Sequence, residues 1–230
     1  MIGFTADGFG VLLTIHSEHG SLHGRLALLP EARGLVILVH DKRALDARDD
    51  VLAGIFRHAG LSTVSVNLLS AQEEHFPDVH NNVPLLAKRL LEFLDLIKNK
   101  MLLGEIEKQA LGLFAANATS PVVVRVAALR DHDIAAIVCR GGLIDLAGTL
   151  YLHSLAAPIL MLVGANDEHL VASNRRALQE ASCHKEMKLI LGCDSDFATT
   201  SAFEVMAHET TQWFLQQLPP SVKIEASPVV

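Results

Sequence analysis

Short, almost uninterrupted apolar runs constrain the fold of this chain more than any other feature. The clearest of them cover residues 34–40 and 158–164. Runs of this length suit a buried strand and are far too short to cross a bilayer. Strands that are apolar along their whole length are typical of parallel sheets whose two faces are both covered by helices.

Segments with helical spacing of their apolar residues alternate with these strands. Strands are predicted over 11–17, 21–29, 34–40, 61–69, 109–114, 134–139, 158–164 and 187–191, and helices over 46–59, 84–100, 121–129, 170–181 and 201–218. Asp46 is the expected N-cap of the first helix and Gly60 follows its end, while Ser201-Ala-Phe-Glu204 has the form of a capping box. This alternation predicts an α/β fold with a mostly parallel central sheet and helices on both faces.

The chain carries no internal repeat, linker or low-complexity segment that would divide it. We therefore expect one domain over residues 1–218, followed by an extended tail over 219–230. Half of the residues are hydrophobic and the mean hydropathy is +0.32, which is enough to build a large core.

Charge and cysteine content narrow the possible partners and compartment. The net charge is −7 and the lysines and arginines are scattered, so the basic patch of a nucleic-acid-binding protein is absent from the sequence. The first residues lack the basic start of a signal peptide, and the three cysteines suit a reducing compartment. We expect a cytoplasmic protein that binds neither nucleic acid nor membrane.

A strand, a sharp turn and a helix are predicted in succession over residues 109–129. At the turn stands Ala115-Ala116-Asn117-Ala118-Thr119, where the nucleophile elbow of hydrolases has the form G-x-S-x-G. Asn117 thus occupies the position of the nucleophilic serine. Asparagine tolerates left-handed backbone angles better than most residues, so it can preserve the turn while abandoning the chemistry.

The order of these elements, with the elbow near the middle, resembles the α/β-hydrolase fold and, more narrowly, its dienelactone-hydrolase-like branch. The resemblance runs over about residues 22–218. Besides the apolar strand over 34–40, the patterns that carry it are Asn67-Leu-Leu-Ser-Ala-Gln-Glu-Glu74, Arg140-Gly-Gly-x-x-Asp145-Leu-Ala147 and Gly164-Ala-Asn-Asp167-Glu.

The resemblance implies where the catalytic groups should stand. The nucleophile position falls on Asn117, the acid position on Asp167, which is retained, and the histidine position on Ser195. The loop that donates an oxyanion-binding N–H in the family reads His40-Asp41-Lys42-Arg43 and has no glycine. Two of the three triad members are therefore replaced, and the oxyanion loop is changed as well.

Other residues near the elbow have simpler interpretations. Ser120, followed by Pro121, is expected to cap the helix that starts there. Cys139 is expected to be a buried, inert thiol. Most histidines are interpreted as surface or structural residues, among them His16, His19, His23, His58, His75 and His80.

Several loop residues are expected at the carboxyl ends of the strands, where open α/β sheets bind ligands. The residues predicted to line the pocket are His40, Asp41, Ala118, Arg140 and Asp194. Two charge arrangements remain open. Asp41, Asp167, Asp194 and Asp196 could gather around a divalent cation, or Lys42, Arg43 and Arg140 could form an anion site with the start of the elbow helix. We favour separate, solvated carboxylates, and predict neither a metal nor a cofactor.

Two functions follow from these observations. The first is a pseudoenzyme that keeps the hydrolase fold but binds a small molecule or a partner protein without hydrolysing anything. The losses at Asn117, Ser195 and Asp41 together favour it. The alternative is an ester or lactone hydrolase with a rearranged mechanism, in which His40 or a carboxylate activates water without an acyl-enzyme.

Overall fold

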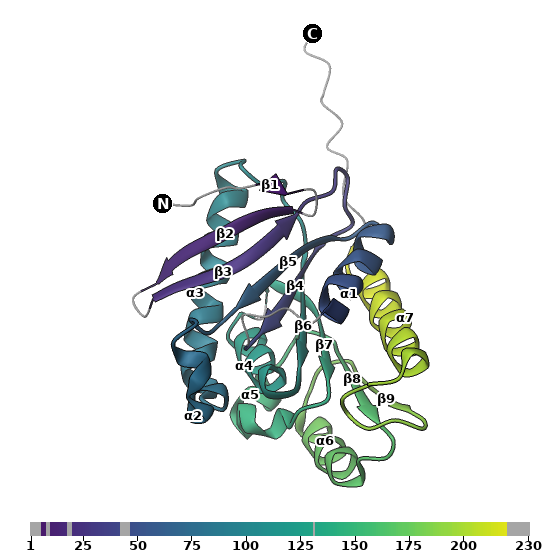
Figure 1. Cartoon of the computed structure of the whole chain (residues 1–230). Coiled ribbons are helices and arrows are strands. Elements are labelled where there is room, and N and C mark those ends of the chain that lie inside the picture. Colours follow the sequence, from purple (N-terminus) through teal and green to yellow (C-terminus); the bar gives the residue numbers. More distant parts are fainter. Residues whose placement is uncertain (1–5, 8–9, 18–19, 42–46, 131, 220–230) are drawn as a thin grey trace.

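A single nine-stranded sheet runs through the computed structural model, which describes residues 6–7, 10–17, 20–41, 47–130 and 132–219. The strand order in this part of the chain is β1-β2-β3-β5-β4-β6-β7-β8-β9 (Figure 1). The strands from β5 to β9 along this order are all parallel, and β1, β2 and β3 extend the sheet in antiparallel fashion. The predicted α/β fold with a mostly parallel sheet is confirmed.

The strands are β1 (Ala6–Asp7), β2 (Gly10–Ser17), β3 (Gly20–Ala27), β4 (Leu35–His40), β5 (Ser62–Asn67), β6 (Leu111–Ala116), β7 (Ile134–Arg140), β8 (Ile159–Gly164) and β9 (Lys185–Ile190). The α-helices are α1 (Ala47–His58), α2 (Pro77–His80), α3 (Val83–Leu102), α4 (Ser120–Leu129), α5 (Thr149–Ser154), α6 (Glu168–Glu180) and α7 (Thr200–Gln217). Single 3₁₀ turns are η1 (Glu73–His75), η2 (Asn117–Thr119) and η3 (Ile144–Ala147). Every predicted strand and helix is present; β1, α2, α5 and the 3₁₀ turns are too short to give a periodic signal.

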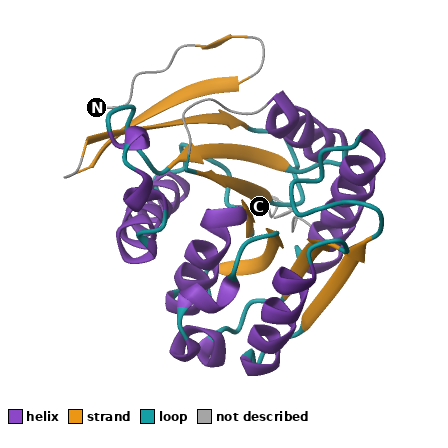
Figure 2. Cartoon of the chain, turned by 60° about the horizontal axis from the view of Figure 1, so that its bottom comes forward, coloured by secondary structure: helices purple, strands orange, loops and turns teal. Residues whose placement is uncertain are grey.

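The alternation of side chains along β4 explains why the central strands are apolar throughout. Leu35, Ile37 and Val39 point to the core layer that contains α3, α4 and α6. Val36 and Leu38 point to the opposite layer, which is formed with α1 and α7. Helices therefore lie on both sides of the sheet (Figures 1 and 2), and each strand position meets an apolar neighbour.

The observed helix ends agree only partly with those predicted from the sequence. Gly60 follows α1 with a φ of 82°, as expected for a residue just past a helix. The capping box predicted at Ser201 is wrong, because α7 begins earlier and its N-cap is Thr199, whose hydroxyl accepts a hydrogen bond from the Ala202 amide at 3.3 Å. The predicted cap at Asp46 lies outside the described residues.

Two further predictions concern the ends of the chain. Pro219 is the last described residue, so the tail predicted over 219–230 lies almost wholly outside the described part, and the single domain over 1–218 remains a prediction. In the described part of the chain, no helix is both long and apolar enough to cross a membrane.

Candidate functional site

The elbow predicted from the sequence is present at the carboxyl end of β6. Strand β6 ends at Ala116, Asn117 follows with a φ of 50°, and α4 begins three residues later at Ser120. Left-handed backbone of this kind is strained for most residues and mild for asparagine. The turn has thus kept the strained geometry that would expose a side chain at its tip, and the Asn117 side chain is exposed there.

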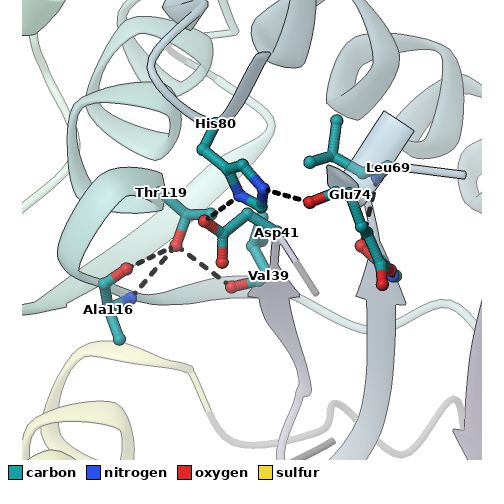
Figure 3. Close-up of polar contacts among 8 residues, drawn as sticks. Val39, Asp41, Leu69, Glu74, His80, Ala116 and Thr119 are labelled. Carbon is teal, nitrogen blue, oxygen red and sulfur yellow. Dashed lines mark hydrogen bonds and ion pairs between the residues drawn. The ribbon is translucent and has the colours of Figure 1, made fainter. Parts of the chain in front are cut away.

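Hydroxyl groups fix the elbow to the neighbouring strands. Thr119 Oγ1 accepts from the Ala116 amide at 3.2 Å and can donate to the carbonyl oxygens of Ala116 at 2.9 Å and Val39 at 3.1 Å (Figure 3). Ser120 Oγ donates to the Gly141 carbonyl at 2.9 Å. The predicted capping role of Ser120 is therefore wrong, since its hydroxyl ties α4 to the end of β7.

Two glycines let the loop after β7 pack directly on the elbow. Gly141 and Gly142 have φ values of 63° and 78°. A Cβ on Gly142 would overlap the Asn117 carbonyl oxygen, and one on Gly141 would lie 2.8 Å from Asn117 Oδ1. Asn174 of α6 holds this loop, because its Nδ2 donates to the Gly142 carbonyl at 2.8 Å. The Arg140-Gly-Gly pattern seen in the sequence is thus a packing requirement of the elbow.

Asp167 and Ser195, which were predicted at the acid and histidine positions, are in direct contact. Asp167 is the N-cap of α6, where its Oδ1 accepts from the Leu170 amide at 3.1 Å. Its Oδ2 accepts from Ser195 Oγ at 3.0 Å. Ser195 thus presents a hydroxyl to Asp167, and a serine hydroxyl does not take up a proton near neutral pH.

The three residues predicted at the triad positions lie near the same glycine. Measured from the place where a Cβ on Gly141 would stand, Asn117 Oδ1 is 2.8 Å away and Ser195 Cβ is 3.4 Å away. Ser195 is in turn bonded to Asp167. The structure therefore brings the three predicted site residues together.

A cavity of about 210 Å³ opens beside the elbow. It is lined by Asn81, Val83, Asn117, Ala118, Pro121, Gly142, Leu143 and Leu146. Ala118 was expected here. The sequence did not predict the lining residues from the start of α3 and from η3, because periodicity places a helix but not the loop that it faces.

Asp41 makes a side-chain contact that the sequence did not predict. Its Oδ2 lies 2.9 Å from His80 Nδ1, and His80 Nε2 lies 3.1 Å from the Glu74 carbonyl oxygen (Figure 3). Both ring nitrogens face acceptors, and both can donate only when the ring is protonated. His80, which was predicted to be a surface or structural residue, holds Asp41 directly after β4. Lys42 and Arg43 of that loop lie outside the described residues.

His40 does not line the elbow cavity, so its predicted place at the pocket mouth is wrong. Alternation along β4 turns the side chain to the α1 face, where Nδ1 lies 3.5 Å from Asp49 Oδ2. Burial lowers the pKa of His40; Asp49 opposes this shift, and the nearby charge of Arg140 adds to it. Arg140, at the end of β7, is thus close to His40 and absent from the elbow cavity lining.

The remaining acidic residues do not form a cluster. Asp194 and Asp196 are exposed, and Asp194 contributes its main chain, against which Gly164 packs tightly. Neither of them lines the elbow cavity. Within the described ranges, no group of three or more His, Cys, Asp or Glu side chains is arranged to hold a metal ion.

Cys139 lies in the core below the elbow. Burial raises its pKa to about 12, and its Sγ lies 3.8 Å from the Ser120 carbonyl oxygen. Its thiolate is therefore not formed near neutral pH, and it offers no replacement nucleophile.

Known structures share this fold over nearly the whole chain. A dienelactone hydrolase from Anabaena variabilis superposes with a TM-score of 0.83 and 27% sequence identity, covering 90% of this chain and 97% of that one. The protein has a dienelactone-hydrolase-like α/β-hydrolase fold. A highly thermostable carboxyl esterase from Bacillus coagulans shares this α/β-hydrolase fold with a TM-score of 0.70 at 10% identity, covering 90% of this chain and 98% of its own.

Curated sequences give a second, partial match to this α/β-hydrolase-fold chain. Proteins described as putative phosphoribosyl transferases from two strains of Mycobacterium tuberculosis are 26% identical over 197 residues. The match covers 85% of this chain but only 44% of the length of those relatives. No protein-family model matches the sequence.

Proposed function

We propose that this chain is a pseudoenzyme, a dienelactone-hydrolase-like protein that binds a small molecule or a partner side chain without hydrolysing it. The observation that carries the proposal is the contact between Asp167 Oδ2 and Ser195 Oγ at 3.0 Å, beside an elbow that presents Asn117. The scaffold holds the three positions together, while the groups placed there lack the required reactivity.

The chemistry of acyl transfer explains why this arrangement should be inactive. The reaction needs a hydroxyl or thiol whose proton is taken by an adjacent base. The Asn117 amide is a poor nucleophile, and the Ser195 hydroxyl is no base. Asp41 adds a carboxylate in the loop that carries the oxyanion-binding N–H in related hydrolases. Negative charge there would disfavour an oxyanion.

The elbow cavity suits a small and largely apolar group. Val83, Pro121, Leu143 and Leu146 supply apolar walls, and Asn117 supplies an amide that can both donate and accept. Its volume of about 210 Å³ lies below the roughly 300 Å³ at the lower end of small-molecule sites. We infer that it takes a compact carboxylic acid, ester or lactone, or one side chain of a partner protein.

The mycobacterial relatives do not change this proposal. Their description as putative phosphoribosyl transferases applies to proteins of which this chain matches less than half. The proposal for this chain rests on the elbow and its cavity, and it assigns no transferase activity here.

An assay of ester and lactone hydrolysis tests the proposal. We expect the wild-type chain and an Asn117→Ala variant to be equally inactive toward p-nitrophenyl esters and dienelactones. Turnover by the wild type that disappears in Asn117→Ala would overturn the proposal and favour a hydrolase with a rearranged mechanism.

Ligand binding at the elbow can be tested separately by thermal shift with small carboxylic acids, esters and lactones. A ligand present at 100 times its dissociation constant stabilises the fold by about 2.7 kcal/mol. Leu143→Trp should fill the cavity and abolish the shift. Leu150→Trp is the matched control, because Leu150 is exposed on α5 and does not line the cavity. A shift that persists in Leu143→Trp would place the ligand elsewhere.

A further inference from the structure

A second cavity lies on the opposite face of the sheet from the elbow cavity. Its volume is about 480 Å³, and it lies between α1 and the strands β3 and β5. Its polar and charged lining residues are Arg25, His40, Asp49, Asp50, Arg57, Thr63 and Ser65. It shares no lining residue with the elbow cavity, so the two sites can be tested independently.

Both carboxylates that line this cavity face a basic side chain, whereas Arg57 faces no carboxylate among the described residues. Arg25 lies 3.7 Å from Asp50, and His40 lies 3.5 Å from Asp49. Within the described residues, Arg57 makes no ion pair, and its Nη1 donates to Thr63 Oγ1 at 3.3 Å. The Arg57 guanidinium therefore retains donors for an anion, and arginine binds phosphate and carboxylate groups through pairs of N–H donors.

The other end of the cavity offers acceptors. Asp49 lies beside His40 Nδ1, which favours the proton at that nitrogen and leaves a lone pair at Nε2. His40 Nε2 is buried and has no hydrogen-bond partner in the part of the chain that the structure describes. A ligand hydroxyl could donate to Nε2 and to the Asp49 carboxylate.

A glycine keeps the space between these two ends open. Gly54 lies in the middle of α1, where glycine destabilises a helix relative to alanine. It has no positive φ, and a Cβ there would meet only Arg57 Nη2, at 3.8 Å. Neither the backbone nor the packing requires a glycine at this position, but a side chain much larger than alanine would project into the cavity.

The two ends are separated by the length of α1. Asp49 is in its first turn and Arg57 in its last, eight residues later, which corresponds to about 12 Å along the axis. We propose that this cavity binds a phosphorylated monosaccharide, with the phosphate on Arg57 and Thr63 and the sugar hydroxyls on His40 and Asp49.

Isothermal titration calorimetry on the full chain tests this proposal. The probes are ribose 5-phosphate and glucose 6-phosphate, with ribose, glucose and inorganic phosphate as comparisons. We expect at least one sugar phosphate to bind with one-to-one stoichiometry, at least tenfold more tightly than its parent sugar and than inorganic phosphate. Absence of binding by both sugar phosphates, or equal binding of inorganic phosphate, would overturn the proposal.

Variants then locate the site. Arg57→Gln should weaken binding at least tenfold, Arg57→Lys should recover part of it, and Gly54→Leu should abolish it. Gly54→Ala is the folding control, because it should stabilise α1 and retain binding, and Leu150→Trp should bind as the wild type does. Binding that survives Gly54→Leu in a folded variant would show that the sugar phosphate binds elsewhere.

Discussion

At the scale of single residues, Asn117 has an unusual backbone conformation at the centre of the proposed site. Its φ of 50° is accessible to asparagine and glycine but strained for alanine. We therefore predict that Asn117→Ala lowers the free energy of unfolding by about 1 kcal/mol, while Asn117→Gly leaves it nearly unchanged. Urea denaturation measures both values. Equal losses in the two variants would show that side-chain contacts, and not the backbone, dominate at this position.

Gly142 is the residue that lets the β7 loop reach the elbow. An alanine there has both a φ of 78° and a clash with the Asn117 carbonyl oxygen. Gly104 is the matched control, since its φ is 73° and nothing lies within 4 Å of its Cβ position. Gly104→Ala should lower the free energy of unfolding by about 1 kcal/mol, and Gly142→Ala by about 1–3 kcal/mol more. Similar losses in the two variants would mean that the loop after β7 can shift to accommodate the alanine at little cost in free energy.

His40 should make stability depend on pH. Its pKa in the folded protein is lowered, mainly by burial, from an ordinary value of 6.5. Because the unfolded chain takes up the proton first, the contribution of His40 is fully present above about pH 6.5 and declines as the pH falls below it. Chemical denaturation between pH 5 and 8 should show that His40→Gln loses less stability on acidification than the wild type. Parallel pH profiles would contradict this prediction.

At the scale of elements, an ion pair between the buried Arg89 and the partly exposed Glu73 fixes the loop between β5 and α3. Arg89 is 1% exposed, and its two Nη atoms donate to the two carboxylate oxygens of Glu73 at 2.9 and 2.6 Å. Arg89 Nη1 also donates to the Leu68 carbonyl at 2.8 Å. This loop carries Glu74, whose carbonyl oxygen contacts His80, so the ion pair indirectly positions the group that holds Asp41.

Breaking this pair should destabilise the whole protein. Glu73→Ala leaves the Arg89 charge buried without its partner, and the expected loss in free energy of unfolding is about 3 kcal/mol. Glu92→Ala is the surface control, because Glu92 meets Lys88 at 3.8 Å near solvent and should lose less than about 1 kcal/mol. Equal losses in the two denaturation curves would contradict a structural role for the buried pair.

The pH dependence of the same pair has a defined direction. The hydrogen bond from Arg89 is the main cause that lowers the pKa of Glu73 from 4.5 to about 2. Its contribution is therefore present above about pH 4.5 and is lost as the pH falls toward 2. Glu73→Ala should lack this part of the acid transition, while Glu92→Ala should retain it.

At the scale of the whole molecule, apolar periodicity was enough to predict the layers of the fold. The strand over 34–40 could be assigned because burial on both faces removes polar residues from it. Asn117, Asp167 and Ser195 could be placed near one another because each follows a strand of the same parallel sheet. The direction of individual loop side chains could not be predicted in this way.

His40 and His80 show why the directions of these side chains could not be predicted. The face to which His40 points depends on the exact register of β4, and an error of one residue reverses it. His80 reaches Asp41 across the sheet edge through the short helix α2, a contact between residues far apart in sequence that no local pattern encodes. The turn at Asn117 could be predicted from the succession of strand, turn and helix, but its surroundings required the structure.

The most direct test of the pseudoenzyme proposal is covalent labelling by a fluorophosphonate, read by intact mass. The wild-type chain should remain unlabelled, because Asn117 offers no hydroxyl. The double variant Asn117→Ser with Ser195→His should gain one adduct, since Asp167 is placed to orient the new imidazole. The single variant Asn117→Ser should label far more slowly. A stoichiometric adduct on the wild type that also abolishes ester hydrolysis would contradict the account.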